Sequence, residues 1–464
     1  MDDLLMTRLF HPRSTTHSMH DMRWIQGVRR LIGWIVCSGV LLGSAACHGL
    51  LDVTNPTLIQ DQTIANAAGA MGWRVSALRE LSTEMSPVAF DVALFTDERG
   101  FDPNVLPTVP GDAPIYFYYD KRDGEVIEQL QSRGYTDPHL AQLDQVVSTT
   151  TLAINAMRSN GPASTKREYL AELFAVRGYA ILQMAEDICP GFPINDLASD
   201  HSVVLSGPYT RDSAVAYALA QLDSAVAYGR DSVNFLSFAR VVRGRALLDL
   251  GRYADASAAV DSVSTSFIYA TDPSVMGNRF AWDNNGCCEP MGEQKGGNGM
   301  PFVSADDPRV QTVYAKQRYL IPEDSLYDQL KYPTNDTPIV LASGIEARLI
   351  QAEAALHEPD PDKAFAILDT LRSTVGLGAL TIPASADDQV DVVYRERAFW
   401  LYLTGRRLGD LRRLITNYGR NAETVFPTGA YPATGTYGTA TAFPFTVTAQ
   451  GQFNSKITAG CTVR

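Results

Sequence analysis

Basic and metal-binding side chains are scarce in this 464-residue sequence. Its 39 Lys and Arg stand against 52 Asp and Glu, a formal net charge of −13. Nucleic-acid binding depends on phosphate neutralisation by Lys and Arg, so this balance argues against a nucleic-acid partner. Only seven histidines occur, and none has zinc-ligand spacing to a cysteine, so we expect no metal site and no cofactor. Phosphate-binding loops, zinc motifs and nucleophile elbows are also absent from the sequence, so we expect no enzymatic activity.

An apolar run long enough to span a membrane is also lacking. The run from Leu31 to Leu42 has about twelve residues, and a transmembrane helix needs ~20. Three arginines precede the run and three small residues follow it: Arg23, Arg29 and Arg30, then Ser44, Ala45 and Ala46. This three-part pattern is typical of a secretory signal peptide. We therefore expect residues 1–46 to be a signal peptide, which starts at Met1, Met19 or Met22.

Cys47 directly follows the small residues. A bacterial lipoprotein signal ends on small residues before a cysteine, which is acylated and becomes the new N-terminus. We therefore expect Cys47 to carry a lipid anchor, and membrane contact through this anchor only. Each buried acyl methylene contributes ~0.8 kcal/mol, so several chains hold a soluble domain firmly on a membrane. Removal of residues 1–46 takes away five Lys or Arg and three Asp or Glu, which changes the formal net charge from −13 to −15.

Four more cysteines follow the signal: Cys189, Cys287, Cys288 and Cys461. In an exported protein they are candidates for up to two disulfides. Adjacent cysteines rarely bond to each other, because the resulting ring strains the peptide. We therefore expect Cys287 and Cys288 each to pair with Cys189 or Cys461, in an order that the sequence leaves open.

Most of the chain before residue 265 has helical periodicity. Apolar residues recur at three- and four-residue spacing in the segments 64–81, 141–157, 166–187 and 211–229. Helix-turn-helix spacing typical of tetratricopeptide units occurs within residues 166–265 and 344–377. In the second unit a proline-rich turn, "EPDPD", joins the two helices. We expect a mostly α fold in which such helix pairs stack to bury a shared core.

Two regions interrupt the helical pattern. Residues 97–119 carry prolines and end in an aromatic cluster, and residues 266–342 are rich in Gly, Asn and Pro. We expect both to form long irregular loops, which in a compact domain are usually functional or disordered. The tail from Tyr418 to Arg464 is rich in Thr, Gly and Phe, and we expect it to pack as extended segments.

Five motifs occur in a recognisable order along the mature chain. They are "LLDVTNPTLI" (Leu50–Ile59), "DDPRV" (Asp306–Val310), "EARLIQAEAAL" (Glu346–Leu356) with "LRSTVGL" (Leu371–Leu377), "RERAFWLYLTGRRLGDLRR" (Arg395–Arg413) and "FPFTVTAQGQFN" (Phe443–Asn454). In this order, behind a lipoprotein signal, they resemble the SusD/RagB family of outer-membrane nutrient-uptake lipoproteins over essentially the whole mature chain. The fourth motif is similar to the family's late helix.

The resemblance implies a SusD-like α/α scaffold over residues 47–464, with tetratricopeptide-like units and long irregular loops. It also implies anchoring at the outer membrane, exposed at the cell surface. Such proteins act as the lid of a TonB-dependent, SusC-like transporter, to which they deliver oligosaccharides or sometimes peptides. They are not enzymes.

Two other functions compete with this interpretation. A tetratricopeptide lipoprotein that scaffolds outer-membrane assembly would present a smooth helical groove, and the two long loops count against it. A helical glycosidase would need two acids that face each other across a cleft. Glu346 and Glu353 lie about a helical period apart on one helix, which does not supply that geometry.

Aromatic side chains in loops are the candidate ligand contacts, because sugar rings stack on flat aromatic faces while polar neighbours bond the hydroxyls. Trp282 lies in the polar stretch "NRFAWDNNGCCEP" beside Asp283 and Asn284, with Phe280 as a weaker neighbour. The alternative for Trp282 is a loop anchor packed on the scaffold.

A second candidate group lies in "YFYYD", where we expect Tyr116 or Tyr118 to contact ligand and alternate rings to face opposite ways. Trp73 and Trp400 lie on predicted amphipathic helices, so we expect them to pack in the core.

The arginine-rich fourth motif has two interpretations. It could form an anion site, or an ion-paired network between packed helices. On one helix Glu396 and Asp410 would each find arginines a turn away: Arg397, Arg406, Arg407 and Arg413. We expect the ion-paired network.

Overall fold

The computed structural model describes residues 65–101, 113–132, 138–198, 202–275, 277–283, 288–289, 298–314, 327–358, 360–431, 435–445 and 461. All of them belong to one unit, Gln62–Arg464. The predicted signal peptide, Cys47, the first motif, Asn284 and Cys287 lie outside the described residues. Within the described part of the chain, no helix combines the length and apolar character needed to cross a membrane.

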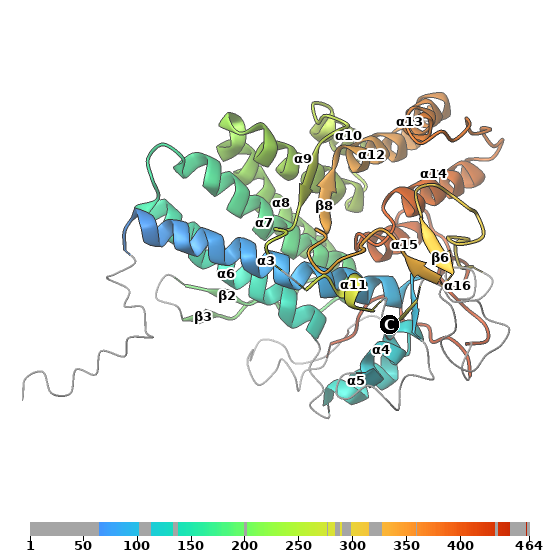
Figure 1. The fold of residues 1–464 in the computed structure, drawn as a ribbon, viewed down its shortest axis with the longest axis horizontal. Helices are drawn as coiled ribbons and strands as arrows, with labels where there is room; N and C mark the ends of the chain where they lie inside the picture. The colour runs from blue at the N-terminus through green and yellow to red at the C-terminus, as the bar shows by residue number, and fades with distance from the viewer. Residues whose placement is uncertain are drawn as a thin grey trace, which may run out of the picture. The chain divides into compact units, whose positions relative to one another are not determined.

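Helices make up most of the unit (Figure 1). The first group comprises α3 (Ala67–Phe95), α4 (Ala113–Asp120), α5 (Gly124–Ser132), α6 (Pro138–Asn160), α7 (Lys166–Asp187), α8 (Arg211–Tyr228), the 3₁₀ turn η1 (Gly229–Asp231), α9 (Val233–Asp249) and α10 (Tyr253–Val260). The second comprises α11 (Arg279–Asp283), α12 (Gly344–His357), α13 (Pro361–Ser373), α14 (Ala386–Trp400), α15 (Arg407–Thr416) and α16 (Ala422–Val425). The predicted mostly α fold class is confirmed.

The described strands are short and form antiparallel pairs. These are β1 (Gly100–Phe101) with β5 (Cys288–Glu289), β2 (Asp196–Leu197) with β3 (Val203–Val204), β4 (Ile268–Ala270) with β8 (Val340–Ser343), and β6 (Thr312–Tyr314) with β7 (Tyr327–Gln329). These pairs join segments that connect the helices, and among the described residues they form no continuous sheet.

Local sequence explains where several helices begin. Asn66 accepts a hydrogen bond from Gly69 N at 2.9 Å at the start of α3, and Ser343 accepts one from Glu346 N at 3.1 Å at the start of α12. Such capping side chains satisfy backbone donors that the helix leaves unpaired. Pro361 occupies the first position of α13 behind its cap Asp360, where its missing N–H costs nothing. The predicted turn therefore separates α12 from α13.

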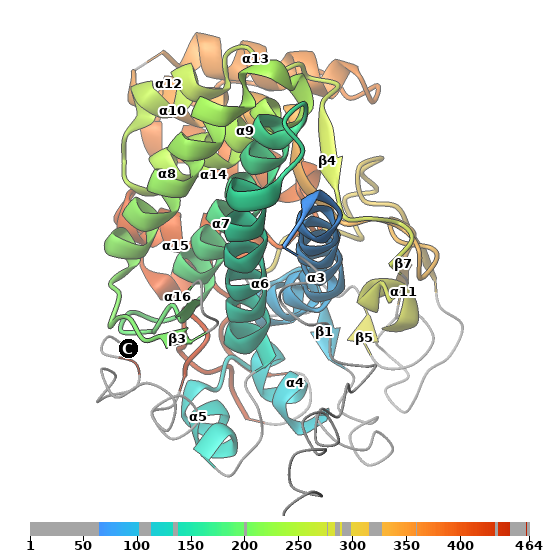
Figure 2. The same cartoon turned by 90° about the vertical axis from the view of Figure 1, so that its left-hand side faces the viewer.

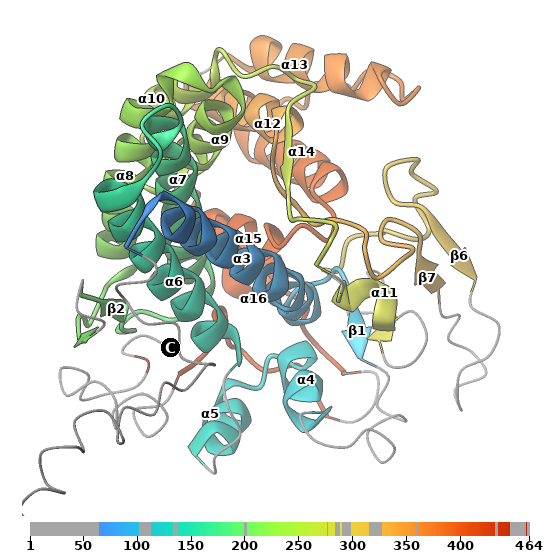
Figure 3. The same cartoon turned by 60° about the vertical axis from the view of Figure 1, so that its left-hand side comes forward.

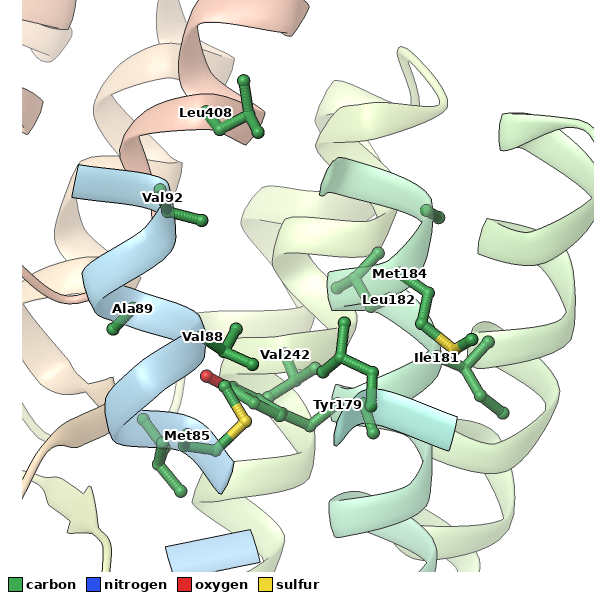
Figure 4. Packing of buried hydrophobic residues seen from close by; sticks show 14 of the residues in the cluster. Met85, Val88, Ala89, Val92, Tyr179, Ile181, Leu182, Met184, Val242 and Leu408 are labelled. Carbon is green, nitrogen blue, oxygen red and sulfur yellow. The ribbon is translucent and has the colours of Figure 1, made fainter. Parts of the chain in front are cut away.

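Successive helices pack side by side, as Figures 2 and 3 show: α3 on α6, α6 on α7, α7 on α8, α8 on α9, α9 on α10, α10 on α12 and α12 on α13. Helix α7 lies in the middle, and every residue from Leu170 to Asp187 is buried. Figure 4 shows Tyr179 of α7 beside Met85 and Val88 of α3. This stacking buries the shared core that repeated helix pairs require.

Gly244 permits the close contact between α9 and α10. A Cβ atom at this position would lie 2.6 Å from Val260 Cγ1 and 3.3 Å from Ile350 Cδ1. We expect Gly244→Ala to lower the free energy of unfolding by ~1–3 kcal/mol, because the extra methyl group overpacks the interface. Equilibrium denaturation measures this change. Gly72→Ala is the matched control, since a Cβ atom at that position would have no heavy atom within 4 Å; equal losses for both variants would contradict the packing argument.

The fourth motif forms two helices, so the single late helix inferred from the resemblance is wrong. α14 ends at Trp400 and α15 begins at Arg407. Leu403 and Gly405 between them have φ values of 56° and 74°, a left-handed conformation that ends helices. The break redirects the arginines that follow it.

The region predicted as a loop at 97–119 is also partly regular. Residues 113–120 form α4, and the segment from Asp97 to Arg99 is buried. The aromatic residues 116–119 therefore lie on a helix, and not on a segment whose rings alternate between two faces as we expected. Asp97 is paired here with Arg407, Glu98 Oε1 accepts a hydrogen bond from Leu403 N, and the Arg99 guanidinium lies over the Phe90 and Phe280 rings.

Cys189 and Cys461 form a disulfide across 272 positions, with a Cα–Cα distance of 5.5 Å. The expectation that each would pair with Cys287 or Cys288 is therefore wrong. A tertiary contact brings the partners together: Phe443 N donates to Asp187 O at 2.8 Å, and Cys189 N donates to Phe443 O at 3.0 Å. The tail thus pairs with the exit of α7 before it reaches Cys461.

Candidate ligand-binding site

Helix α11 is held firmly against the C-terminal half of α3. Arg279 N donates to Ser86 Oγ at 2.7 Å. The buried Asn278 accepts hydrogen bonds from Phe280 N at 3.0 Å and Ala281 N at 3.4 Å, and its Nδ2 donates to Thr337 O at 2.6 Å. These bonds fix the start of the short helix that carries the predicted loop contacts, Trp282 included.

An aromatic cluster joins α3, α4 and α11. The Phe90 ring lies 6.1 Å from Tyr116 and 5.6 Å from Phe280, both edge to face. Phe280 stacks on Tyr332 at 5.1 Å. The Arg279 guanidinium lies 5.3 Å from the Phe90 ring and 5.2 Å from the Tyr116 ring. Ring and cation contacts of this kind stabilise a rigid aromatic surface.

The cluster divides into a buried layer and a half-buried rim. Phe280 is fully buried, which corrects its prediction as a ligand contact, because its faces are occupied by Phe90 and Tyr332. Tyr116 and Arg279 are half-buried and form the rim. Tyr118 is also half-buried, but its ring contacts Phe117 on another side of α4 and does not join this cluster. The structure thus brings Tyr116 of the second predicted group next to α11, which carries the first predicted group.

Three of the predicted ligand contacts, Trp282, Asp283 and Asn284, have no described side chain. The backbone of Trp282 and Asp283 belongs to α11, but the positions of their side chains, like that of Cys288, are outside the described set. Their role in ligand contact stays a prediction. Trp73 and Trp400 are partly buried against hydrophobic clusters, as expected for core packing.

The rim offers two kinds of contact to a small polar ligand. The partly exposed Tyr116 provides an aromatic face and a phenolic hydroxyl, and Arg279 provides guanidinium donors. Sugar C–H faces stack on rings while hydroxyl groups accept and donate hydrogen bonds, so this combination suits an oligosaccharide. The sequence reasoning missed Arg279 and Phe90, although Arg279 stands only three positions before Trp282.

The arginines of the fourth motif form the predicted ion-paired network: Asp410 keeps its predicted partner Arg413 one turn away, and Arg397 reaches it across the helix break. Asp410 accepts from Arg397 Nη2 and Arg413 Nη2, both at 2.7 Å. Burial disfavours the charged carboxylate, but the two guanidinium groups outweigh it and lower the pKa of Asp410 to about 2. Glu396 pairs with Arg309 and Arg372 instead of neighbours on its own helix.

Arg406 and Arg407 reach other parts of the core. Arg406 donates to Tyr179 Oη at 2.6 Å and to Leu341 O at 2.8 Å, and Arg407 pairs with Asp97 at 2.7 Å. Figure 3 shows α15 beside α3. The network therefore ties the late helices to the helix that supports the candidate site.

The carboxylates considered for a glycosidase pair are inside this network. Glu346 and Glu353 are buried, and they pair with Arg245 at 3.3 Å and with Arg413 at 3.2 Å, respectively. Carboxylates held in this way serve the scaffold, since a hydrolytic pair must flank a bound sugar.

Another titratable pair lies below the cluster. Burial raises the pKa of Glu98 to about 8 and lowers that of Lys331 to about 8. Glu98 Oε1 accepts from Leu403 N at 2.8 Å, and Lys331 precedes Tyr332, the residue that stacks on Phe280. Glu98 is buried in the core, whereas Lys331 is half-buried.

No family model and no curated relative match the sequence. Solved structures do match. A SusD-like protein from Bacteroides fragilis is 14% identical, with a TM-score of 0.59 over 87% of this chain and 99% of its own. Surface glycan-binding protein A from Bacteroides uniformis is 13% identical, with a TM-score of 0.57 over 85% of this chain and 99% of its own.

A laminarin-binding SusD-like protein is 14% identical, with a TM-score of 0.54 over 78% of this chain and 96% of its own. Identities this low establish the fold, and the coverage shows that the similarity extends over nearly all of each solved chain. The resemblance inferred from the five motifs is confirmed at this level. This chain has the SusD-like fold.

Proposed function

We propose that the protein is a cell-surface glycan-binding lipoprotein that serves, without catalysis, as the lid of a TonB-dependent outer-membrane transporter. The observation that carries the proposal is the rim of Tyr116 and Arg279 over the buried Phe90 and Phe280, on a SusD-like scaffold. Two proteins with the same fold are named for laminarin and surface-glycan binding. An oligosaccharide is therefore the ligand class that fits both the fold and the rim.

Export is supported by the disulfide between Cys189 and Cys461. Disulfides persist in oxidising compartments and are rare in the cytosol. Together with the predicted signal peptide and the acylated Cys47, this bond favours a location outside the cytoplasm. The lipid on Cys47 would hold the protein at the outer membrane.

Replacement of Tyr116 tests ligand binding at the rim. We expect Tyr116→Ala to weaken glycan affinity about tenfold, equivalent to ~1.4 kcal/mol, because one stacking face and its hydroxyl are lost. Calorimetry of the mature protein against a glycan panel measures the affinity, with laminarin as the first probe and Trp282→Ala in parallel.

Tyr209→Ala is the matched control. Tyr209 is a half-buried tyrosine that stacks on Tyr217 at 6.0 Å, away from the α4 and α11 cluster. Equal affinities of Tyr116→Ala, Trp282→Ala and wild type would remove the rim from the proposal. Absence of binding to every glycan would overturn the sugar-lid function, and release of sugar products would overturn the non-catalytic one.

The transporter and the location have separate tests. Affinity purification of the tagged protein from native outer membranes should recover a TonB-dependent receptor, and its absence would remove the lid role. Protease treatment of intact cells should cut a surface-exposed protein. Protection would favour the alternative scaffold that faces inward.

A further inference from the structure

One end of the helical unit gathers exposed basic and aliphatic side chains that the glycan site does not use. At this end α3, α7 and α9 begin and the α6–α7 turn lies beside the start of α3 (Figures 1 and 2). Contacts between elements define it. Arg74 of α3 pairs with Glu172 of α7 at 2.5 Å, and Arg167 of α7 pairs with Asp231 of η1 at 3.7 Å. Tyr269 of β4 donates to Glu172 Oε1 at 3.1 Å.

The aliphatic members are unusually exposed for a folded protein. Val233, the first residue of α9, is 82% exposed, Ile268 on β4 is 62% exposed and Val75 on α3 is 57% exposed. Val75 is next to Arg74 and Ile268 is next to Tyr269, and both of these neighbours contact Glu172. Val233 lies two residues after Asp231, which pairs with Arg167. Exposed apolar side chains that cluster in this way usually mark an interaction surface.

Four basic residues surround them: Arg158, Lys166, Arg167 and Arg230. Arg158, Arg167 and Arg230 are exposed and Lys166 is half-buried. The first lies at the end of α6, the next two at the start of α7 and the last in η1. Two acidic residues, Glu168 and Asp231, lie in the same turns. This excess of positive charge occurs on a chain whose formal net charge is −13.

The connection to the predicted anchor and the charge of this end favour a membrane as its partner. The described chain begins at this end, at residue 65, so the segment that follows Cys47 joins the helical unit here. About 20 residues separate Cys47 from Ala67, which allows the unit to reach the membrane that would hold the lipid. Separated aliphatic side chains with Lys and Arg around them are typical of surfaces that lie on a bilayer.

We propose that this basic end, defined by Arg158, Lys166, Arg167, Arg230, Val75, Val233 and Ile268, docks on the anionic headgroups of the membrane that holds the Cys47 lipid. The arginines bond lipid phosphates, and the valines and isoleucine enter the interfacial layer. The contact orients the unit on its tether, and it rests on the lipid anchoring in the proposed function. It adds a second membrane contact to the lipid anchor, which was the only one that we expected from the sequence. A protein partner is disfavoured because the exposed apolar residues here are small aliphatics without aromatic anchors.

Vesicle co-sedimentation tests the docking. The probe is the full mature chain carrying Cys47→Ser, so that no acyl group contributes, with vesicles of phosphatidylcholine alone or with 30% phosphatidylglycerol. We expect binding to the anionic vesicles that falls with added salt, and little binding to the neutral ones. The triple variant Arg158→Gln, Arg167→Gln, Arg230→Gln should bind at least tenfold more weakly.

A second triple variant, Arg243→Gln, Arg252→Gln, Arg420→Gln, removes the same charge from other surface ion pairs and should bind like the parent. Circular dichroism confirms that both variants are folded. Equal binding of both triple variants, or no binding to anionic vesicles, would overturn the docking. Loss of transporter recovery without vesicle binding would overturn it in favour of a protein contact.

The measured mass of the native protein shows whether Cys47 is acylated, and so distinguishes a failure of this inference from a failure of the proposed function. An unacylated Cys47 removes the anchoring and the docking together. An acylated protein that binds glycan, but whose Cys47→Ser form ignores anionic vesicles, removes only the docking.

Discussion

Asp410→Ala is expected to lower the free energy of unfolding by ~3–5 kcal/mol. The substitution leaves the guanidinium groups of Arg397 and Arg413 without a carboxylate that each now meets at 2.7 Å. Both arginines are fully buried, so water does not replace the lost partner. Equilibrium denaturation at neutral pH, followed by circular dichroism, measures the change.

The exposed pair of Arg252 and Asp255 is the matched control, because its N–O distance is 2.6 Å but both side chains are about half exposed. We expect Asp255→Ala to cost less than ~1 kcal/mol, as exposed ion pairs contribute little. A loss for Asp410→Ala no larger than that for Asp255→Ala would show that burial of the network is not what stabilises the late helices.

The pH dependence of the same site has a defined sign. The pKa of Asp410 is lower in the folded protein than its ordinary value of 3.8 and falls to about 2. Its contribution to stability is therefore present above pH 3.8 and is lost as the pH falls through 2. The difference between wild type and Asp410→Asn should shrink over that range.

His139→Gln is the second substitution with a large expected effect. His139 lies fully buried between two carboxylates, with Nε2 2.9 Å from Asp187 Oδ2 and Nδ1 3.4 Å from Asp91 Oδ2. Phe443 stacks on its ring at 4.2 Å. Loss of the imidazolium leaves two buried carboxylates without this cation, which should cost ~3–5 kcal/mol.

The contribution of His139 should also depend on pH in the alkaline range. Burial disfavours the imidazolium, but the hydrogen bonds to Asp187 and Asp91 outweigh it and raise the pKa of His139 from 6.5 to about 10. Its stabilisation is therefore fully present below pH 6.5, decreases above it, and is lost as the pH rises through 10. The stability difference between wild type and His139→Gln should narrow between pH 7 and pH 10.5.

Denaturation of both proteins at each pH measures this difference. His357→Gln controls for the loss of a histidine, since His357 is exposed, and we expect it to change stability by no more than ~0.5 kcal/mol. A difference between wild type and His139→Gln that stays constant across the range would contradict an imidazolium at this position.

Asp97 and Phe443 connect the late helices and the C-terminal tail to the region of the ligand rim. Asp97 follows α3 and binds both Arg407 and Met300 N, the latter at 3.0 Å. Phe443 lies 4.5 Å from Phe95 and 4.9 Å from Tyr119. The rim residues Tyr116 and Arg279 therefore rest on helices that buried charges and the C-terminal tail both hold in place.

Local patterns in the sequence were sufficient to predict the helices. The segment 166–187 was predicted from apolar periodicity alone and coincides with α7, because the spacing of side chains along a helix is a local property. Capping residues and prolines marked helix starts such as that of α13 for the same reason. The five motifs, taken in order, were sufficient to predict the SusD-like fold.

The candidate site could be predicted only in part. Periodicity and composition indicated aromatic residues in irregular regions, and Tyr116 does lie at a rim beside α11. Composition did not reveal that Phe280 is buried or that Arg279 lies between Phe90 and Tyr116, because these contacts join residues almost 200 positions apart.

The amino-acid sequence by itself determined the long helices before residue 265, where several helices begin, and which order of motifs the scaffold follows. The tertiary structure decided which cysteines bond, where the late helix breaks and which carboxylate meets each arginine. Those outcomes depend on distance between segments far apart in the chain and on burial that makes an unpaired charge costly. Neither quantity can be read from the spacing of residues along the chain.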